Sequence, residues 1–210
     1  MHDLLKALIN TEDELRELLG NPSELVSRKV VSHIDRHCKY FIAKSPLIFI
    51  STSNKGGFCD VSPRGDAPGF VETMDDTYLI IPERPGNKRC DSLTNILTNP
   101  QIGIIFIIPG LKETLRINGK AMISRDEKLL ERHHVNGKTP KIAIIVEVEE
   151  CYIHCAKAFI RSKLWNKETW LSGNDLPKIS QILADHVGNI SFTANKISDA
   201  LKESYKERLY

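Results

Sequence analysis

The sequence contains no long apolar run and no strong charge of either sign. Its longest apolar stretches, Ile102–Ile108 and Ile142–Val148, are far shorter than the roughly 20 residues that a membrane-spanning helix needs. Lysine and arginine number 29 against 27 aspartates and glutamates, so the net charge is only +2. Because this balance creates no global field for nucleic acid or an anionic membrane, we expect neither partner, and any anion-binding site must be local.

Cysteine is also scarce, and its count is odd. The five residues are Cys38, Cys59, Cys90, Cys151 and Cys155. Met1–Asp3 lack the basic start of a signal peptide, so we expect reduced thiols and a cytoplasmic protein. Cys151 and Cys155 have no second pair with which to build a tetrahedral site, so no metal is expected. We expect Cys59 and Cys90 to be buried, inert thiols.

The remaining composition is that of a globular protein. Hydrophobic residues make up 41% and charged residues 27% of the 210 residues, which excludes disorder and fits one structural domain. Within that domain we expect a helical extension over residues 1–45, a central part over 46–170 and a helical segment over 171–210.

Several signals mark the expected helices. Thr11 followed by Glu14 is a capping box for a first helix, which Gly20 ends. A second helix is expected from Pro22 to just before Ser45. Shorter or later helices are expected over Asp91–Thr98, after Asp126, and through Ile179, Ile182, Leu183 and His186 to the break at Gly188.

Six segments are expected to be strands, because they are rich in isoleucine, valine, phenylalanine and threonine and are bounded by turn residues. They are Leu47–Thr52, Phe58–Ser62, Thr77–Ile81, Ile102–Ile108, Thr114–Ile123 and Lys141–Glu149. Their mostly short connections favour an antiparallel barrel over a βαβ sheet. The predicted class is therefore mainly β with flanking helices (α+β), built on a six-stranded antiparallel β-barrel.

The loop from Arg84 to Arg89 is the most informative segment. It joins a strand to a helix, and it combines Gly86 with the cations Arg84, Lys88 and Arg89. A glycine turn, helix N-terminal amides and cationic side chains together form a phosphate site by mechanism. A solvated basic loop that merely begins a helix would give the same pattern.

Three other segments could take part in a site. Ser62–Phe70 is stiffened by two prolines and two glycines and presents Arg64 and Asp66. Thr114, Arg116 and Asn118 share one strand face, either to line a groove or to meet solvent. His154–Trp165 combines cations with an aromatic ring that could stack on a planar ligand or pack at an interface.

Taken together and in this order, the segments resemble the pyridoxamine 5′-phosphate oxidase-like FMN-binding split-barrel flavoproteins. The similar motifs are D-V-S-P-R-G-D-A-P-G-F-V (60 to 71), I-P-E-R-P-G-N-K-R (81 to 89), D-S-L-T-N-I-L-T-N-P-Q-I-G-I-I-F-I-I-P-G (91 to 110), E-T-L-R-I-N-G-K-A (113 to 121) and H-C-A-K-A-F-I-R-S-K-L-W (154 to 165). The resemblance implies a split barrel, FMN as cofactor, and a homodimer that binds FMN between its subunits.

The resemblance also implies which residues hold FMN. Its basic phosphate-binding pair falls on Lys88 and Arg89, and Arg64 would face the same phosphate. Other positions implied in the cofactor site are Val61, Ser62 and Pro63 along the flavin, Pro82 and Asn87 in the loop motif, Thr114 at a position occupied by a flavin-contacting glutamine in the B6 oxidases, and Arg161, Ser162 and Trp165 from the other subunit.

One departure limits the implied activity. The vitamin B6 oxidases carry Trp-Gln-Gly and then Arg-x-His near the C-terminus, and no Arg-x-His follows Trp165 here. We therefore expect an FMN-dependent oxidoreductase that acts on an unknown small molecule and is not a pyridoxamine phosphate oxidase, with no catalytic residue assigned. The alternative is a non-catalytic sensor or storage protein for flavin, deazaflavin or haem, for which His154 would be the axial ligand.

Overall fold

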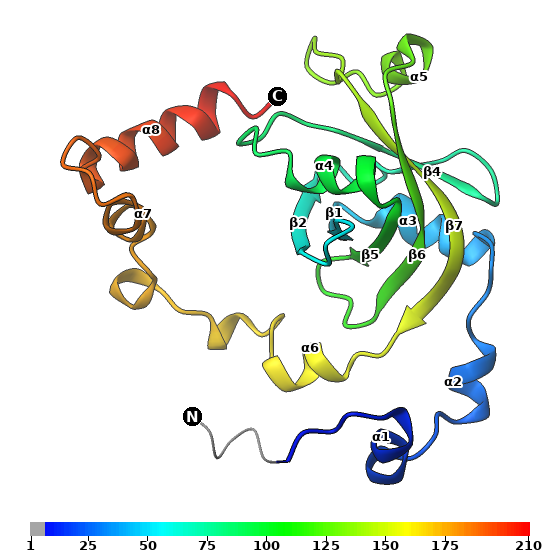
Figure 1. Ribbon diagram of the computed structural model, residues 1–210. Helices are drawn as coiled ribbons and strands as arrows, with labels where there is room; N and C mark the ends of the chain where they lie inside the picture. The colour runs from blue at the N-terminus through cyan, green and yellow to red at the C-terminus, as the bar shows by residue number, and fades with distance from the viewer. Residues whose placement is uncertain (1–6) are drawn as a thin grey trace.

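The computed structural model describes residues 7–210, and the expectation drawn from Met1–Asp3 lies outside them. Seven strands form one sheet in the order β2-β1-β5-β6-β7-β4-β3, with every neighbouring pair antiparallel (Figure 1). The strands are β1 Leu47–Ser53, β2 Cys59–Gly65, β3 Glu72–Thr73, β4 Tyr78–Pro82, β5 Gln101–Ile107, β6 Thr114–Ser124 and β7 Ala143–His154.

Helices precede, interrupt and follow the sheet. The α-helices are α1 Glu12–Leu19, α2 Glu24–Arg28, α3 Arg36–Lys44, α4 Asp91–Thr98, α5 Glu127–Glu131, α6 Lys157–Ser162, α7 Ile179–Val187 and α8 Ala194–Glu207, and two 3₁₀ turns are η2 Lys167–Thr169 and η3 Gly173–Asp175. The antiparallel α+β class is confirmed. No helix within residues 7–210 has both the length and the apolar character needed to cross a membrane.

The expected number of strands was wrong by one. The additional strand, β3, has only two residues, too few to show an alternating pattern in the sequence. The predicted closure into a barrel is also not confirmed. The two ends of the sheet are β2 and β3, and these strands do not pair with each other within the described part of the chain.

The core occupies one face of the curved sheet. Alternation in β1 buries Ile48 and Ile50, and the same face of β5 buries Ile104 and Phe106. Helix α3 packs Ile42 into this cluster. Burying each such side chain fully contributes about 1.5–3 kcal/mol, so this face supplies most of the stability.

The expected second helix was wrong, because it is divided into α2 and α3. Between them Val31 leaves the helix and exchanges two backbone hydrogen bonds with Cys151 of β7, at N···O distances of 3.1 and 2.7 Å. Those bonds satisfy an edge of β7 that β4 does not reach. Asp35 then begins α3 by accepting hydrogen bonds from the N–H groups of His37 and Cys38.

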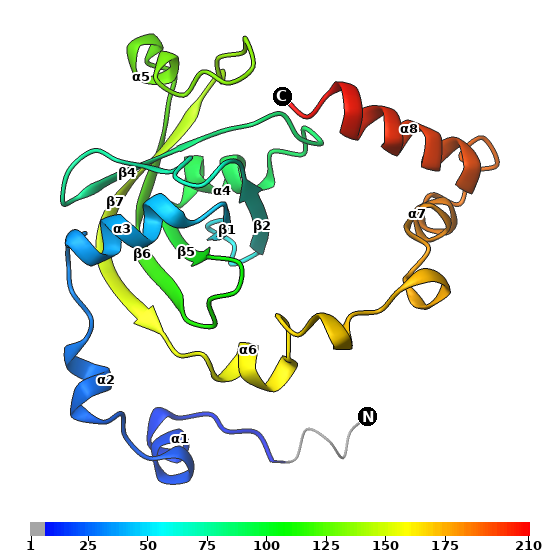
Figure 2. The same cartoon turned by 180° about the vertical axis from the view of Figure 1, so that it is seen from behind.

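The two ends of the chain form arms that contact the core at only a few points, among them Tyr210, whose hydroxyl donates to Asp66 at 2.8 Å. The capping box of Thr11 and Glu14 is confirmed in α1, and α7 ends at Gly188 as expected. None of α1, α2, α6, α7 or α8 contains a buried residue. Figures 1 and 2 show α6 to α8 curving away from the sheet, with the end of α8 returning toward the β4–α4 connection.

Candidate functional site

The loop between β4 and α4 has an unusual backbone. Lys88 and Cys90 adopt φ values of 63° and 59°, a left-handed conformation that non-glycine residues seldom adopt. Cys90 is the residue before α4, and its side chain makes no capping hydrogen bond. The first-turn N–H groups of α4 therefore point outward without a capping side chain, as a helix that receives an anion requires.

Strand β2 presents Arg64 to this loop. The Arg64 Nε donates to Glu83 Oε2 at 3.0 Å, and its Nη1 donates to Ser62 Oγ at 2.6 Å. Glu83 directly follows β4, so this ion pair joins the edge strand β2 to the beginning of the loop. The Arg64 side chain is only 18% exposed, and its Nη2 makes no hydrogen bond among the described residues.

A chain of hydrogen bonds continues from Arg64 to α4. Because Ser62 Oγ accepts from Arg64, its own proton is free to be donated to Ser92 Oγ, 3.1 Å away. Ser92 in turn donates to Asp60 Oδ2 at 2.6 Å. Asp60, Glu83 and Ser92 were not among the expected site residues, because their roles depend on which strand lies beside which helix.

The cations of the loop divide into three environments. Arg84 is 14% exposed and donates to Asp66 Oδ2 at 2.7 Å and to the carbonyl of His133 at 2.8 Å, so it holds the fold together. Arg89 is exposed and bound to Asp91 at 2.7 Å, which raises the pKa of the guanidinium. Lys88 is exposed and forms no ion pair within residues 7–210.

The three expected flavin-facing residues of β2 lie on two faces of the strand. Ser62 faces Arg64 and α4, whereas Val61 and Pro63 are exposed on the other face. Because β2 is an edge strand, which also explains how Pro63 is tolerated, a ligand along its free edge could reach both faces.

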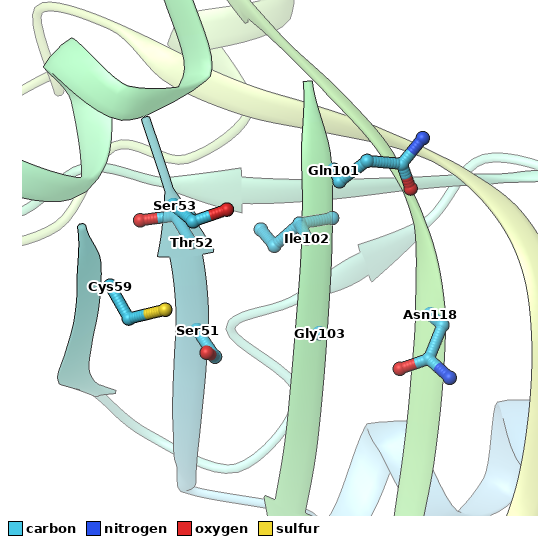
Figure 3. A pocket seen from close by; sticks show the side chains of 8 residues that line it. All are labelled: Ser51, Thr52, Ser53, Cys59, Gln101, Ile102, Gly103 and Asn118. Carbon is cyan, nitrogen blue, oxygen red and sulfur yellow. The ribbon is translucent and has the colours of Figure 1, made fainter. Parts of the chain in front are cut away.

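An open hollow of about 260 Å³ lies across β2, β1, β5 and β6 (Figure 3). Its lining residues are Ser51, Thr52, Ser53, Cys59, Gln101, Ile102, Gly103 and Asn118. Ser51, Gly103 and Asn118 are aligned across three neighbouring strands. Ser51 is also aligned with Val61, so the hollow adjoins the exposed face of β2.

The remaining expected residues have mainly structural contacts within one chain. Pro82 is buried opposite Ala143, and Thr114 is buried opposite His154 at the start of β6. Asn87 accepts a hydrogen bond from the backbone N–H of Arg89 and so shapes the loop. Cys59 and Cys90 are exposed, so their expected burial was wrong: Cys59 lies on an edge strand and Cys90 in the loop.

The segment after β7 is far from this loop within one chain. Trp165 donates from Nε1 to the carbonyl of Leu111 at 2.8 Å, and its ring centroid is 5.9 Å from that of Phe159. Arg161 and Ser162 are exposed on α6. Both views in Figures 1 and 2 show α6 at the opposite end of the sheet from the β4–α4 loop.

Many solved structures, including the following three, are similar to part of the chain. HupZ of Group A Streptococcus is 22% identical over 58% of this chain and 99% of its own, with a TM-score of 0.47. An FMN-binding protein from Syntrophomonas wolfei is 13% identical over 69% and 94%, with a TM-score of 0.42. HutZ, the heme storage protein from Vibrio cholerae, is 13% identical over 58% and 93%, with a TM-score of 0.39.

These likenesses are too distant to assign a ligand, and no curated protein matches the chain. The family comparison is more informative. The model of the pyridoxamine 5′-phosphate oxidase family matches residues 34–155, which run from just before α3 to the end of β7. The match includes all the residues described around the β4–α4 loop, namely Asp60, Ser62, Arg64, Glu83, Lys88, Arg89 and Ser92. With more than half of its length matched, the chain belongs to the pyridoxamine 5′-phosphate oxidase family.

Proposed function

We propose that the protein binds FMN, with the flavin phosphate held by Lys88, Arg89 and Arg64. The observation that carries this proposal is the convergence of an edge strand, a left-handed loop and an uncapped helix N-terminus on one small region. Family membership supports the choice of a flavin over another phosphate ester.

The residues present fit a phosphate dianion. Lys88 supplies a cation that no carboxylate neutralises within the described part of the chain, and Arg64 retains Nη2 for a further acceptor. Cys90 contributes no capping side chain, so the amides of α4 are available as donors. Glu83 and Asp91 are already paired with Arg64 and Arg89, so the phosphate would share these two guanidiniums with them.

These contacts indicate what the protein itself contributes to the site. The series of hydrogen bonds from Arg64 through Ser62 and Ser92 to Asp60 fixes the donor groups before a ligand arrives, which reduces the entropy lost on binding. The exposed apolar surface of Val61 and Pro63 is suited to a flat ring. FMN when bound would supply the redox chemistry, and the protein would bind and orient it.

We further propose a homodimeric oxidoreductase in which the partner supplies the second wall of the site. Figure 1 shows α6, which carries Arg161 and Ser162 and precedes Trp165, at the opposite end of the sheet from the β4–α4 loop, so we assign these residues to the site of the other subunit. The outer sheet face also presents Phe49, which is 36% exposed, and Ile105, which is 39% exposed, aligned side by side on neighbouring strands. A second copy of the protein would bury Phe49 and Ile105 and would bring its own Arg161, Ser162 and Trp165 to the site.

The decisive experiment is a titration of the purified protein with FMN, followed by flavin fluorescence. Replacing Lys88→Ala together with Arg89→Ala should weaken binding by a hundredfold or more, because two charge-assisted contacts at about 1.5–3 kcal/mol each are lost. The matched control is Lys202→Ala with Lys206→Ala, two exposed lysines of α8. Unchanged FMN affinity in the loop variant would refute the phosphate site.

The absorbance spectrum separates the remaining possibilities. Flavin bands support the proposal, whereas a Soret band would replace it with haem binding through His154. If FMN binds, reduction by a nicotinamide nucleotide and reoxidation by an added acceptor would establish the oxidoreductase. Tight binding without turnover would favour the sensor or storage alternative.

A further inference from the structure

Two buried thiols from distant parts of the chain meet in the core. Cys38 lies in the first turn of α3, and Cys151 lies near the end of β7, 113 residues further along. Their sulfur atoms are 3.1 Å apart. A disulfide has an S–S bond of about 2.05 Å, so the two sulfurs need to approach by only about 1 Å.

The backbone on each side holds this pair in place. Cys151 is fixed by its two backbone hydrogen bonds with Val31, at 3.1 and 2.7 Å. The Cys38 N–H donates to the carboxylate of Asp35 at 2.8 Å, which anchors the start of α3. The proximity of the two sulfurs therefore follows from the backbone hydrogen bonds that hold Val31, just before α3, against the edge of β7.

The two thiols differ in accessibility. Cys38 is 8% exposed, whereas Cys151 has no exposed surface. A small oxidant would therefore reach Cys38 first. The hydrogen bond to Cys38 and burial raise the pKa of Cys151, so this thiol stays protonated until its sulfur reacts.

We propose that Cys38 and Cys151 are a redox modification site, at which hydrogen peroxide converts the two thiols into an intramolecular disulfide. The Cys38 sulfur first takes one oxygen from the peroxide, becomes a sulfenic acid and releases one water. The Cys151 sulfur then displaces hydroxide from Cys38 and gives up its proton, forming a second water. One peroxide and two thiols thus yield one disulfide and two waters.

The cross-link would close a loop of 113 residues and fasten α3 to β7. A loop of this length strongly restricts the unfolded chain, so the oxidised protein should melt about 5–15 °C higher than the reduced protein. This effect does not depend on flavin binding, and the test needs no cofactor.

The experiment uses the full chain with its exposed thiols removed by Cys59→Ser, Cys90→Ser and Cys155→Ser. The folded protein is treated with hydrogen peroxide, denatured, alkylated with N-ethylmaleimide and weighed by intact mass spectrometry. We expect a monomer that has lost two hydrogens and carries no alkyl group, with two alkyl groups restored by dithiothreitol.

A matched control adds Cys38→Ala to the same background, which should abolish both the disulfide and the rise in Tm. Two alkyl groups after peroxide treatment would overturn the proposal. Sulfinic acid at Cys38 without a cross-link, or a disulfide between two chains, would overturn it equally.

Discussion

At the scale of single residues, Asp66 has the most consequential contacts. It accepts from Arg84 at 2.7 Å and from the hydroxyl of Tyr210 at 2.8 Å, and its side chain is 3% exposed. Burial alone would raise its pKa, but hydrogen bonds from the Ala67 N–H, Tyr210 and Arg84 outweigh burial and lower it. The ionised form is therefore bound more tightly in the folded protein than in the unfolded one.

A depressed folded pKa makes a definite prediction for acid stability. Ionised Asp66 makes its full contribution to the free energy of unfolding well above the pKa of the unfolded state, near 3.8. That contribution is lost as the pH falls through this value toward the lower pKa of the folded state. Asp66→Asn should cost about 3 kcal/mol at pH 7, because it leaves the Arg84 guanidinium without its partner. Urea unfolding between pH 7 and pH 3 should show that the difference in free energy of unfolding between the wild type and Asp66→Asn becomes smaller as the pH falls. A difference that stays constant over this range would contradict the prediction.

At the scale of elements, the bulge between β6 and β7 depends on Gly119. The pairing shifts between Asn118 and Gly119, and a Cβ at Gly119 would lie 2.0 Å from the carbonyl oxygen of Glu147. Because that contact is with backbone, one of the two longest strands would have to move.

Gly119→Ala should therefore lower the free energy of unfolding by about 3 kcal/mol or more, measured by urea denaturation. The matched substitution is Gly103→Ala, at which the new Cβ would meet Asn118 Oδ1 at an ordinary 3.4 Å. We expect this second change to cost less than about 1 kcal/mol. Equal losses at the two positions would show that the bulge tolerates a side chain.

The helices and strands that local sequence patterns predicted differ in kind from those that they missed. Periodicity located six strands, and local chemistry located the cap at Thr11 and the end of α7 at Gly188, because these signals lie within a few residues of each other. The break at Val31 was missed, since it depends on a bond to Cys151. Lys88 could be proposed because its motif is local, whereas the contact between Ser62 and Ser92 could not, because the two residues are 30 positions apart in the sequence.

At the scale of the whole molecule, the exposed outer face predicts association. Phe49, Ile105 and Arg116 are aligned across β1, β5 and β6 on this face. If two copies pack there, Ile105→Lys should convert a dimer into a monomer in sedimentation velocity and weaken FMN binding at least tenfold, because the partner wall is lost.

Leu25→Lys is the matched control, since Leu25 is 77% exposed on α2 and lies outside the proposed interface. A wild-type protein that sediments as a monomer at micromolar concentration would remove the dimer from the proposal. A variant Ile105→Lys that remains a dimer with unchanged FMN affinity would place the interface elsewhere on the molecule.

The pairing of Arg64 with Glu83 and of Arg89 with Asp91 has a consequence for kinetics. Electrostatic steering depends on the uncompensated charge that an approaching ligand encounters, and around this loop only Lys88 lacks an ion pair among the described residues. A dianionic ligand should therefore be steered by one unpaired cation rather than by the whole group of cations around the loop. Its association rate constant should fall with ionic strength only as far as that single charge allows, and Lys88→Ala should remove most of this salt dependence.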